Sequence, residues 1–261
     1  MKTNKLRELL RAGKPTLGTR IHSTWPSVIE AAARTGLYDY VEFVAEYAPF
    51  TLHDLDHMAR TAEVYGLSLM IKVDDENRGY VAQRAIGSGF DSVLFTDCRT
   101  VEDARACIRA VRPDTPADGG RYGVAARRFA YMGEAGTAEY VQALREVVVA
   151  LMIEKKTAVE SLEQILALPG LDMVQWGAAD YSMSIGMPGQ RTAPEVVAAG
   201  DRVFATALRL GVPPRAEILA ADEAKRYLDM GVRHFNISYD LRILHEFWRE
   251  QGEQVRRALA E

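Results

Sequence analysis

Short runs of apolar and β-branched residues alternate along the chain with longer segments of helical character. In those longer segments apolar side chains recur at i, i+3 and i+4, which predicts amphipathic helices. The pattern predicts eight strands, at Leu17–Ile21, Tyr40–Ala45, Leu67–Val73, Ser92–Asp97, Val147–Glu154, Met173–Asp180, Arg215–Ala220 and His234–Tyr239. Regular alternation of strand and helix is typical of a parallel sheet with helices packed outside it.

Eight strand–helix units favour closure into a (β/α)8 TIM barrel, an α/β fold, over an open doubly wound sheet. No G-x-G-x-x-G turn follows the first predicted strand, so nothing supports a dinucleotide-binding fold. A barrel of this kind needs about 250 residues, and the chain has 261. We therefore expect residues 1–261 to form a single barrel domain.

Composition narrows the class of function. The formal net charge is −4, with 48% hydrophobic and 26% charged residues, which is ordinary for a globular protein. No run of basic residues indicates nucleic acid or an anionic membrane as a partner, and no stretch approaches the ~20 apolar residues of a membrane span. The first residues lack the apolar core of a signal peptide. We expect a cytoplasmic protein that acts on a small molecule.

Two other features of the chain stand out. Cys98 and Cys107 are the two cysteines, and we expect buried reduced thiols rather than a disulfide. The connection from Pro113 to Glu139 is long and rich in Gly and Arg, and it includes Arg127 and Arg128. Long connections in compact domains are usually functional or disordered, and both interpretations stay open here.

Polar side chains gather where the predicted strands end. Active sites of such barrels lie at the carboxyl ends of the strands, so these residues are expected at one mouth. Several acidic side chains brought together there would repel one another unless cations held them. A hard divalent ion such as Mg²⁺ or Mn²⁺ suits a set of oxygen ligands. The residues are Arg20, His22, Glu46, Tyr47, Lys72, Asp74, Asp75, Asp97, Glu154, Lys155, Lys156, Asp180, Glu217, Asn236, Ser238 and Asp240.

Several segments resemble the class II, metal-dependent pyruvate aldolases. That group is the HpcH/HpaI aldolase and citrate-lyase-beta-like family, typified by 4-hydroxy-2-oxoheptanedioate and 2-dehydro-3-deoxyglucarate aldolases. The resemblance runs from about Leu6 to the last helix. Its most specific parts are I-E at Ile153–Glu154 and G-x-A-D at Gly177–Asp180. The segments are LGTRIHSTWPSVIEAAARTG, EYAP, ALMIEKKTAVESLEQILALPGLDMVQWGAADYSMSIG and AKRYLDMGVRHF.

The resemblance implies a pyruvate-domain barrel and a set of roles at its mouth. It implies that Glu154 and Asp180 bind a divalent ion, Mg²⁺ or Mn²⁺, which chelates the carboxylate and ketone oxygens of a pyruvate-like substrate and stabilises the enolate. It further implies that the Gly177–Ala179 segment binds substrate, with the N–H groups of Ala179 and Asp180 holding the substrate carboxylate.

The chain departs from the family pattern where protons are transferred. The family typically has E-H-A-P after strand two, with an Asp three residues before the His. Here Tyr47 follows Glu46, and Val44 stands three residues earlier. The family's Arg at the end of strand three corresponds to Lys72, and its Gln two residues before the metal-binding Glu corresponds to Met152. Lys keeps the charge of Arg but lacks its planar fork.

Each of the other candidate site residues has two possible roles. Lys72 either neutralises the enolate oxygen or is a charge partner for Asp74, Asp75 or the metal-binding carboxylates. Tyr47 is either a proton donor or a packed aromatic ring, and His22 is either the imidazole of the mouth or structural. Arg20 either pairs with a distal carboxylate of the substrate or neutralises the acidic mouth.

The leading hypothesis is a metal-dependent carbon–carbon lyase that cleaves a 4-hydroxy-2-oxo acid. A metal-bound water, His22 or Tyr47 would relay the proton. The alternative is decarboxylation of, or biosynthetic condensation with, an oxo-acid enolate on the same site, because decarboxylation needs no base to form the enolate. A barrel that binds a metabolite without turnover is the third hypothesis.

The last helix carries apolar residues that need a partner. Leu244, Phe247 and Trp248 lie in the amphipathic segment at about residues 241–261. Members of the resembled family exchange this helix between subunits. The resemblance therefore implies a homo-oligomer, such as a dimer, trimer or hexamer, with a swapped C-terminal helix.

Overall fold

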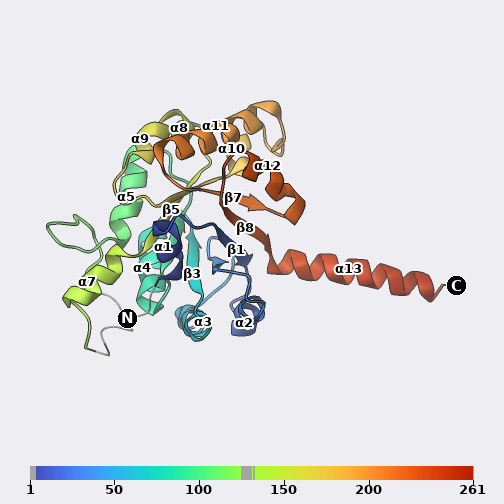
Figure 1. Cartoon of the computed structure of the whole chain (residues 1–261), viewed down its shortest axis with the longest axis horizontal. Helices are drawn as coiled ribbons and strands as arrows, with labels where there is room; N and C mark the ends of the chain where they lie inside the picture. Colours follow the sequence, from blue (N-terminus) through green and yellow to red (C-terminus); the bar gives the residue numbers. More distant parts are fainter. Residues whose placement is uncertain (1–3, 125–130, 132, 261) are drawn as a thin grey trace.

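The eight strands pair in sequence order and close into one parallel barrel in the computed structural model (Figure 1). β1 pairs with β2 on one side and with β8 on the other, which completes the ring. The structure describes residues 4–124, 131 and 133–260. The predicted (β/α)8 fold is confirmed. The strands are β1 (Thr16–Ile21), β2 (Tyr40–Val44), β3 (Ser68–Val73), β4 (Ser92–Phe95), β5 (Val148–Ile153), β6 (Met173–Trp176), β7 (Pro214–Ile218) and β8 (His234–Tyr239).

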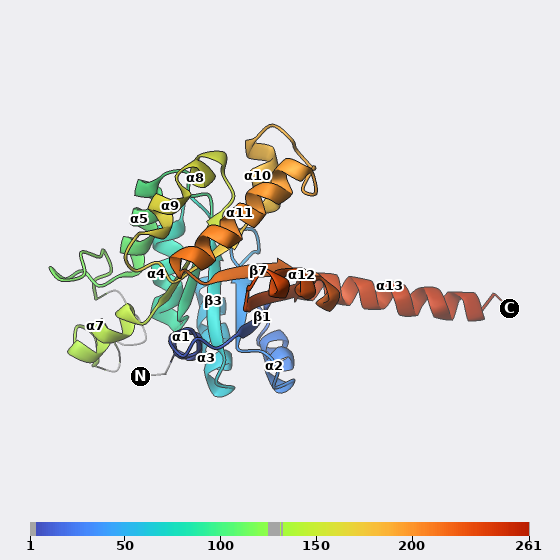
Figure 2. The ribbon, with the colours of Figure 1, turned by 45° about the horizontal axis from the view of Figure 1, so that its top comes forward.

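Helices follow the strands and surround the barrel (Figure 2). Several begin at residues that satisfy their first N–H groups, as Thr51 and Thr100 do in capping boxes. The helices are α1 (Lys5–Arg11), α2 (Pro26–Arg34), α3 (Leu52–Val64), α4 (Arg78–Ser88), α5 (Val101–Val111), α7 (Ala138–Arg145), α8 (Lys156–Glu160), α9 (Leu162–Leu166), α10 (Ala178–Ser184), α11 (Pro194–Leu210), the 3-10 turn η1 (Ala221–Glu223), α12 (Ala224–Asp229) and α13 (Asp240–Ala258).

Alternate strand residues belong to different apolar cores. β3 and β5 are buried along their whole length, as expected for strands covered on both faces. Tyr40, Met70 and Met152 belong to a core separate from the larger one between sheet and helices. Gly18 makes room for it, since a Cβ there would lie 2.3 Å from the Tyr40 ring.

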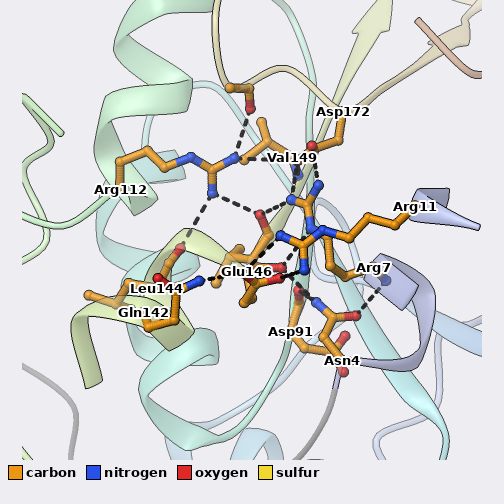
Figure 3. Close-up of polar contacts among 12 residues, drawn as sticks. Asn4, Arg7, Arg11, Asp91, Arg112, Gln142, Leu144, Glu146, Val149 and Asp172 are labelled. Carbon is orange, nitrogen blue, oxygen red and sulfur yellow. Dashed lines mark hydrogen bonds and ion pairs between the residues drawn. The ribbon is translucent and has the colours of Figure 1, made fainter. Parts of the chain in front are cut away.

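The first helix covers the end of the barrel where strands begin, opposite the mouth. Leu6 is fully buried, and its N–H donates to Ser68 Oγ at the start of β3. Figure 3 shows the polar contacts around it: Arg7 pairs with Asp172, and Asp172 also accepts from Arg112. Sequence patterning did not predict α1, because its seven residues are too few to display a periodic apolar face.

The segment that follows β6 at the mouth is a helix, where the sequence had predicted that the strand continues. The predicted strand Met173–Asp180 ends at Trp176, and residues from Ala178 begin α10. Gly177 adopts φ −115° and ψ 85° and separates the two elements. The strand prediction over residues 177–180 was therefore wrong, and Asp180 stands in the first turn of a helix.

The long connection after α5 is partly ordered into secondary structure. Pro113 forms a bridge with Tyr122, and α7 occupies Ala138–Arg145, which the sequence pattern had not predicted. Arg127 and Arg128 lie outside the described residues. The cysteine expectation is confirmed: Cys98 and Cys107 are free, buried thiols with their Sγ atoms 3.6 Å apart.

The C-terminal helix projects away from the barrel (Figures 1 and 2). Phe247 is 61% exposed and Trp248 is 67% exposed on α13. Among the residues that the structure describes, no helix combines the length and apolar character needed to cross a membrane.

Candidate functional site

Glu154 is the most deeply buried carboxylate of the mouth. It follows β5 directly and is 3% exposed, and its Oε1 accepts the backbone N–H of Asp97 at 2.8 Å. Burial raises the pKa of Glu154 to about 7, although the Asp97 N–H and the charge of Lys72 act in the opposite direction. A carboxyl group held in this state is stabilised as an anion only if a cation approaches it.

Gly177 provides the space that the Glu154 carboxylate occupies. A Cβ built at position 177 would lie 2.6 Å from both Cβ and Oε2 of Glu154. The backbone φ of −115° is open to any residue, so the requirement for glycine is one of close approach. The G-x-A-D motif therefore includes a glycine that fits the glutamate of the I-E motif.

Asp97, which follows β4, contacts Glu154 directly and is linked to Asp180 through Lys155. Its φ is 58°, in the left-handed region that Asp tolerates better than most residues. In that conformation its N–H reaches Glu154, while its side chain contacts Lys155 Nζ at 2.6 Å. Although burial alone would raise the pKa of Asp97, the Lys155 ammonium lowers it overall.

Asp180 is half exposed and points toward the same lysine. Lys155 Nζ donates to Asp180 Oδ1 at 2.9 Å, and the Asp180 side chain is 48% exposed. Lys155 thus bridges Asp97 and Asp180 beside Glu154. Lys155 was expected at the mouth, but no role was predicted for it. Its position directly after Glu154 could have indicated that it pairs with neighbouring carboxylates.

The donor set at this edge of the barrel is compatible with a divalent ion. Glu154 and Asp180 offer carboxylate oxygens, which Mg²⁺ prefers while it keeps several waters. Within residues 4–124, 131 and 133–260, no group of three or more His, Cys, Asp or Glu side chains is arranged as a metal site. Gly177 lets the Glu154 carboxylate approach the backbone just before α10, the helix that carries Asp180, so both carboxylates belong to this edge of the barrel.

Lys72 lies inside the mouth, and its partner is a carboxylate from the neighbouring strand. It is 8% exposed and forms an ion pair with Glu46, and its Nζ is 5.3 Å from the Tyr47 ring centre. Burial alone would lower the pKa of Lys72, but Glu46 raises it overall, so this ammonium stays charged. Glu46 had not been expected as the partner. Of the expected carboxylates, Asp74 and Asp75 have other contacts, with Asp75 bound to Arg78 at 2.9 Å, whereas the charge of Lys72 does act on Glu154.

Arg20 belongs to a second ion pair on the far side of the mouth. Its Nη1 is 2.6 Å from Glu217 Oε1, and Glu217 also accepts a hydrogen bond from Gln175 at 2.8 Å. The Arg20 guanidinium lies 5.2 Å from the Tyr239 ring centre. Arg20 therefore neutralises an acidic residue of the mouth, which is one of the two readings of its role.

His22 is held by the first residue of α13. His22 Nδ1 lies 3.2 Å from Asp240 Oδ1, and Asp240 also accepts the backbone N–H groups of His22 and Ser23. The ring stacks on Tyr47 with centroids 5.6 Å apart and meets the edge of Tyr239 at 5.1 Å. Sequence analysis named His22 but not this arrangement, because Asp240 is more than two hundred residues away.

Asn236 had been placed at the mouth, and that placement is wrong. It is fully buried, and its Nδ2 donates to Glu42 Oε2 at 3.0 Å. The same Glu42 forms an ion pair with Arg215 at 2.5 Å, with both side chains inaccessible. Asn236 lies two residues before Ser238 on β8, so its side chain points into the barrel below the mouth.

The chain is similar to known proteins over most of its length. The model of the family described as HpcH/HpaI aldolase/citrate lyase matches residues 20–245. A 2-keto-3-deoxy-L-rhamnonate aldolase from Escherichia coli O17:K52:H18 is 28% identical over 243 residues, covering 91% of this chain and 88% of that protein.

Two solved structures are similar over nearly the whole chain. A HpcH/HpaI aldolase/citrate lyase family protein from Burkholderia cenocepacia J2315 superposes with a TM-score of 0.87 at 29% identity, covering 97% of this chain and 100% of that one. A HpcH/HpaI aldolase from Desulfitobacterium hafniense DCB-2 gives a TM-score of 0.86 at 25% identity, covering 97% of both chains.

Proposed function

Because the chain belongs to the HpcH/HpaI aldolase/citrate lyase family and is a carbon–carbon lyase acting on a 2-oxo acid, we propose that its substrate is a 4-hydroxy-2-oxo acid. Cleavage between C3 and C4 would release pyruvate, or a close relative, and an aldehyde. The name of the Escherichia coli relative describes a compound of this class, since a 2-keto-3-deoxy acid carries its first hydroxyl at C4.

One observation carries the proposal: a buried glutamate beside an obligatory glycine. Glu154 has a pKa raised to about 7, and Gly177 leaves space at its free oxygen. Glu154 and Asp180 would hold Mg²⁺ or Mn²⁺, and the bound ion would supply Lewis acidity at the 2-oxo group. Lys155, which pairs with Asp180 here, would then keep Asp97 as its partner.

Residues around that position would bind the rest of the substrate. N–H groups in the first turn of a helix have no acceptor within the helix, so those of Ala179 and Asp180, beside Gly177, suit a substrate carboxylate. Lys72 has the charge to neutralise an enolate oxygen, and it would exchange part of its ion pair with Glu46 for that contact. Arg20 would bind a distal carboxylate only by leaving Glu217.

A second reaction fits the same residues. Decarboxylation of an oxaloacetate-like acid, or condensation of an oxo-acid enolate, is favoured by Tyr47 standing after Glu46 where the resembled family has a histidine. Decarboxylation creates the enolate without a base.

We also propose a cytoplasmic location and a C-terminal helix that is swapped between subunits. The swap is proposed because α13 exposes an apolar surface outside the barrel.

The proposal is tested by pyruvate release, followed through NADH oxidation by lactate dehydrogenase. The substrates are several 4-hydroxy-2-oxo acids, including 2-keto-3-deoxy-L-rhamnonate, and oxaloacetate, each with Mg²⁺, Mn²⁺ or a chelator. We expect metal-dependent release that falls at least about a hundredfold in Glu154→Gln. Glu160→Gln, an exposed carboxylate on α8, is the matched control and should keep full activity.

The co-product decides among the alternatives. An aldehyde establishes the lyase reaction on a 4-hydroxy-2-oxo acid. Carbon dioxide from oxaloacetate without cleavage of any hydroxy acid would favour decarboxylation instead. Absence of product from every substrate would contradict the proposal and favour condensation or a binding role.

A further inference from the structure

We propose that His22 is the proton-transfer residue of this site and that Asp240 is its positioning residue, an inference that rests on the proposed lyase function. The pair joins the ends of β1 and β8, where residues distant in sequence meet across the closure of the barrel. Neither the I-E motif nor the G-x-A-D motif includes these positions.

Asp240 is built into the fold as a fixed acceptor. It is 8% exposed, and its carboxylate accepts the backbone N–H groups of His22, Ser23 and Leu241 at 2.8 to 3.1 Å. Although burial alone would raise the pKa of Asp240, these hydrogen bonds and the His22 ring lower it, so the group stays ionised. An ionised carboxylate that cannot rotate fixes the ring that contacts it.

The carboxylate determines which imidazole nitrogen is free. Because His22 Nδ1 lies 3.2 Å from Asp240 Oδ1, the Nδ1–H tautomer is favoured, and Nε2 carries the lone pair. The Tyr47 face and the Tyr239 edge restrict the ring on two sides. The His22 side chain remains 16% exposed, so it is fixed in orientation yet reachable from the mouth.

His22 also stands on the side of the barrel where the reacting bond would lie. In the closed strand order β1 is four strands from β5, so His22 and Glu154 lie on opposite sides of the mouth. A 4-hydroxy-2-oxo acid held at its carboxylate and ketone near β5 and β6 would extend its hydroxyl end toward β1 and β8. The C4 hydroxyl is the group from which a base must remove a proton.

The proton and electrons balance within the substrate and the imidazole. His22 Nε2 accepts the C4 hydroxyl proton, the C3–C4 bond breaks, and C4 becomes the aldehyde carbonyl carbon. The bonding electron pair stays on the three-carbon fragment as an enolate. The same proton, returned from His22 to C3, gives the methyl group of pyruvate and regenerates the neutral ring.

The other titratable side chains near the ring are less suited to accept a proton. Burial raises the pKa of Tyr47, so its phenol stays protonated at neutral pH. Lys72 is a charged ammonium paired with Glu46, and Arg20 is paired with Glu217. Tyr239 contacts the His22 ring by its edge. His22 is therefore the group in this cluster that is oriented to accept a proton.

The test separates proton transfer from binding and from the lyase function itself. Cleavage of a 4-hydroxy-2-oxo acid, decarboxylation of oxaloacetate, and exchange of pyruvate methyl protons with deuterium by NMR are measured with Mg²⁺. In His22→Gln we expect cleavage and exchange to fall about a hundredfold or more. Release of carbon dioxide from oxaloacetate should fall much less than cleavage does, because forming that enolate needs no base. His57→Gln, an exposed histidine on α3, is the matched control.

The results distinguish the two proposals. Cleavage and exchange that persist in His22→Gln within about threefold of the wild-type protein would overturn the role of His22. If the wild-type protein cleaves no hydroxy acid, the lyase proposal fails, and the exchange reaction still tests His22. If the wild-type protein shows neither cleavage nor exchange, both proposals fall.

Asp240→Asn tests the positioning role separately. Nitrogen NMR of the His22 ring should show the Nδ1–H tautomer in the wild-type protein and a changed tautomer population in the variant. Cleavage should fall at least about tenfold, with KM changed less than kcat. His22→Gln in the same spectra assigns the signal. An unchanged tautomer together with unchanged kcat would overturn the role of Asp240, and an unfolded variant is replaced by Asp240→Glu.

Discussion

At the scale of single residues, the site depends on fits that no other residue type provides. Gly177 is required by the volume of the Glu154 side chain rather than by its own backbone angles. Asp97 adopts φ 58° and presents its N–H to Glu154. Both features fix the position of the buried Glu154 carboxylate, and both belong to the segments that follow strands β4 and β6.

Gly177→Ala is expected to disturb Glu154 without unfolding the protein. The new methyl group would overlap the carboxylate, so Glu154 must shift, and Mg²⁺ affinity should fall at least about tenfold. Stability should fall by about 1–3 kcal/mol. Gly79→Ala on α4 meets nothing within 4 Å and is the control, expected to leave both quantities nearly unchanged. Equal metal affinity in the two variants would contradict the fit described here. Isothermal titration and urea unfolding measure the two effects.

His234 gives the fold a dependence on pH that is separate from the site. It begins β8, is 8% exposed, and its Nδ1 lies 3.0 Å from Thr16 Oγ1. Burial lowers the pKa of His234 to about 4. The unfolded chain therefore binds a proton at His234 more tightly than the folded one. The contribution of the neutral His234 ring to the free energy of unfolding is complete above pH 6.5 and is lost as the pH falls toward 4.

The expected size of this effect is about 2.5 kcal/mol between pH 7.5 and 4.5. Urea unfolding at the two pH values measures it. Other groups also titrate in this range, so the comparison is with His234→Gln, whose stability should fall by about that much less over the same interval. A parallel loss in both proteins would show that His234 does not titrate as described.

At the scale of elements, the periodicity of apolar residues predicted the eight strand–helix units of the barrel. The position of polar residues after the strands predicted which side chains would gather at its mouth. The long apolar runs of β3 and β5 and the amphipathic helices between strands were readable because each has enough residues to repeat its pattern. The short helices α1, α7 and α10 were missed, since one or two turns show no period. Asp180 was thus expected at a strand end but lies in the first turn of α10.

Contacts between distant segments could not be predicted from spacing. Lys72 was expected to be a charge partner of Asp74, Asp75 or the metal-binding carboxylates, but its ion pair is with Glu46, which follows the neighbouring strand β2. His22 and Asp240 come together only because the barrel closes. Asn236 was expected at the mouth, but it lies deeper along β8, fully buried beside Glu42. The sequence motifs were enough to predict Glu154 and Asp180 as candidate metal ligands. The side-chain pairs described above depend on how distant strands align in the folded barrel, which the motifs do not contain.

Helix α1 should contribute stability without affecting catalysis. Arg7 is 12% exposed at its side chain and pairs with Asp172 at the end of the barrel away from the mouth (Figure 3). Arg7→Ala should cost about 2 kcal/mol, because Asp172 keeps Arg112 but loses a charged partner. Arg11→Ala removes a 63% exposed arginine of the same helix and should cost less than about 1 kcal/mol. Urea unfolding measures both changes, and equal losses would contradict the account.

At the scale of the whole molecule, the barrel and the projecting helix have different surfaces. The strands of the barrel bury most of their apolar residues, while α13 carries Leu244, Phe247 and Trp248 with 42%, 61% and 67% of their surface exposed. Apolar side chains gathered on a helix outside the core mark an interaction surface. A second copy of the chain is the partner that we propose for it.

Light scattering at micromolar concentration is expected to give a dimer or a larger assembly. Replacing Phe247 and Trp248 by Glu should shift the protein toward the monomer, because both side chains would have to be buried in the contact. Exchange of the polar residues Gln251 and Gln254 for Glu is the control. A monomeric wild-type protein would contradict the assembly.

The central claim is that Glu154 and Asp180 together hold the divalent ion of a 2-oxo-acid lyase. Titration of Mn²⁺, followed by the electron paramagnetic resonance signal of the free ion, tests it without relying on any substrate. We expect one site per chain in the wild-type protein, weakened at least about tenfold in both Glu154→Gln and Asp180→Asn. Mn²⁺ binding that is equally strong in the wild-type protein and both variants would contradict it.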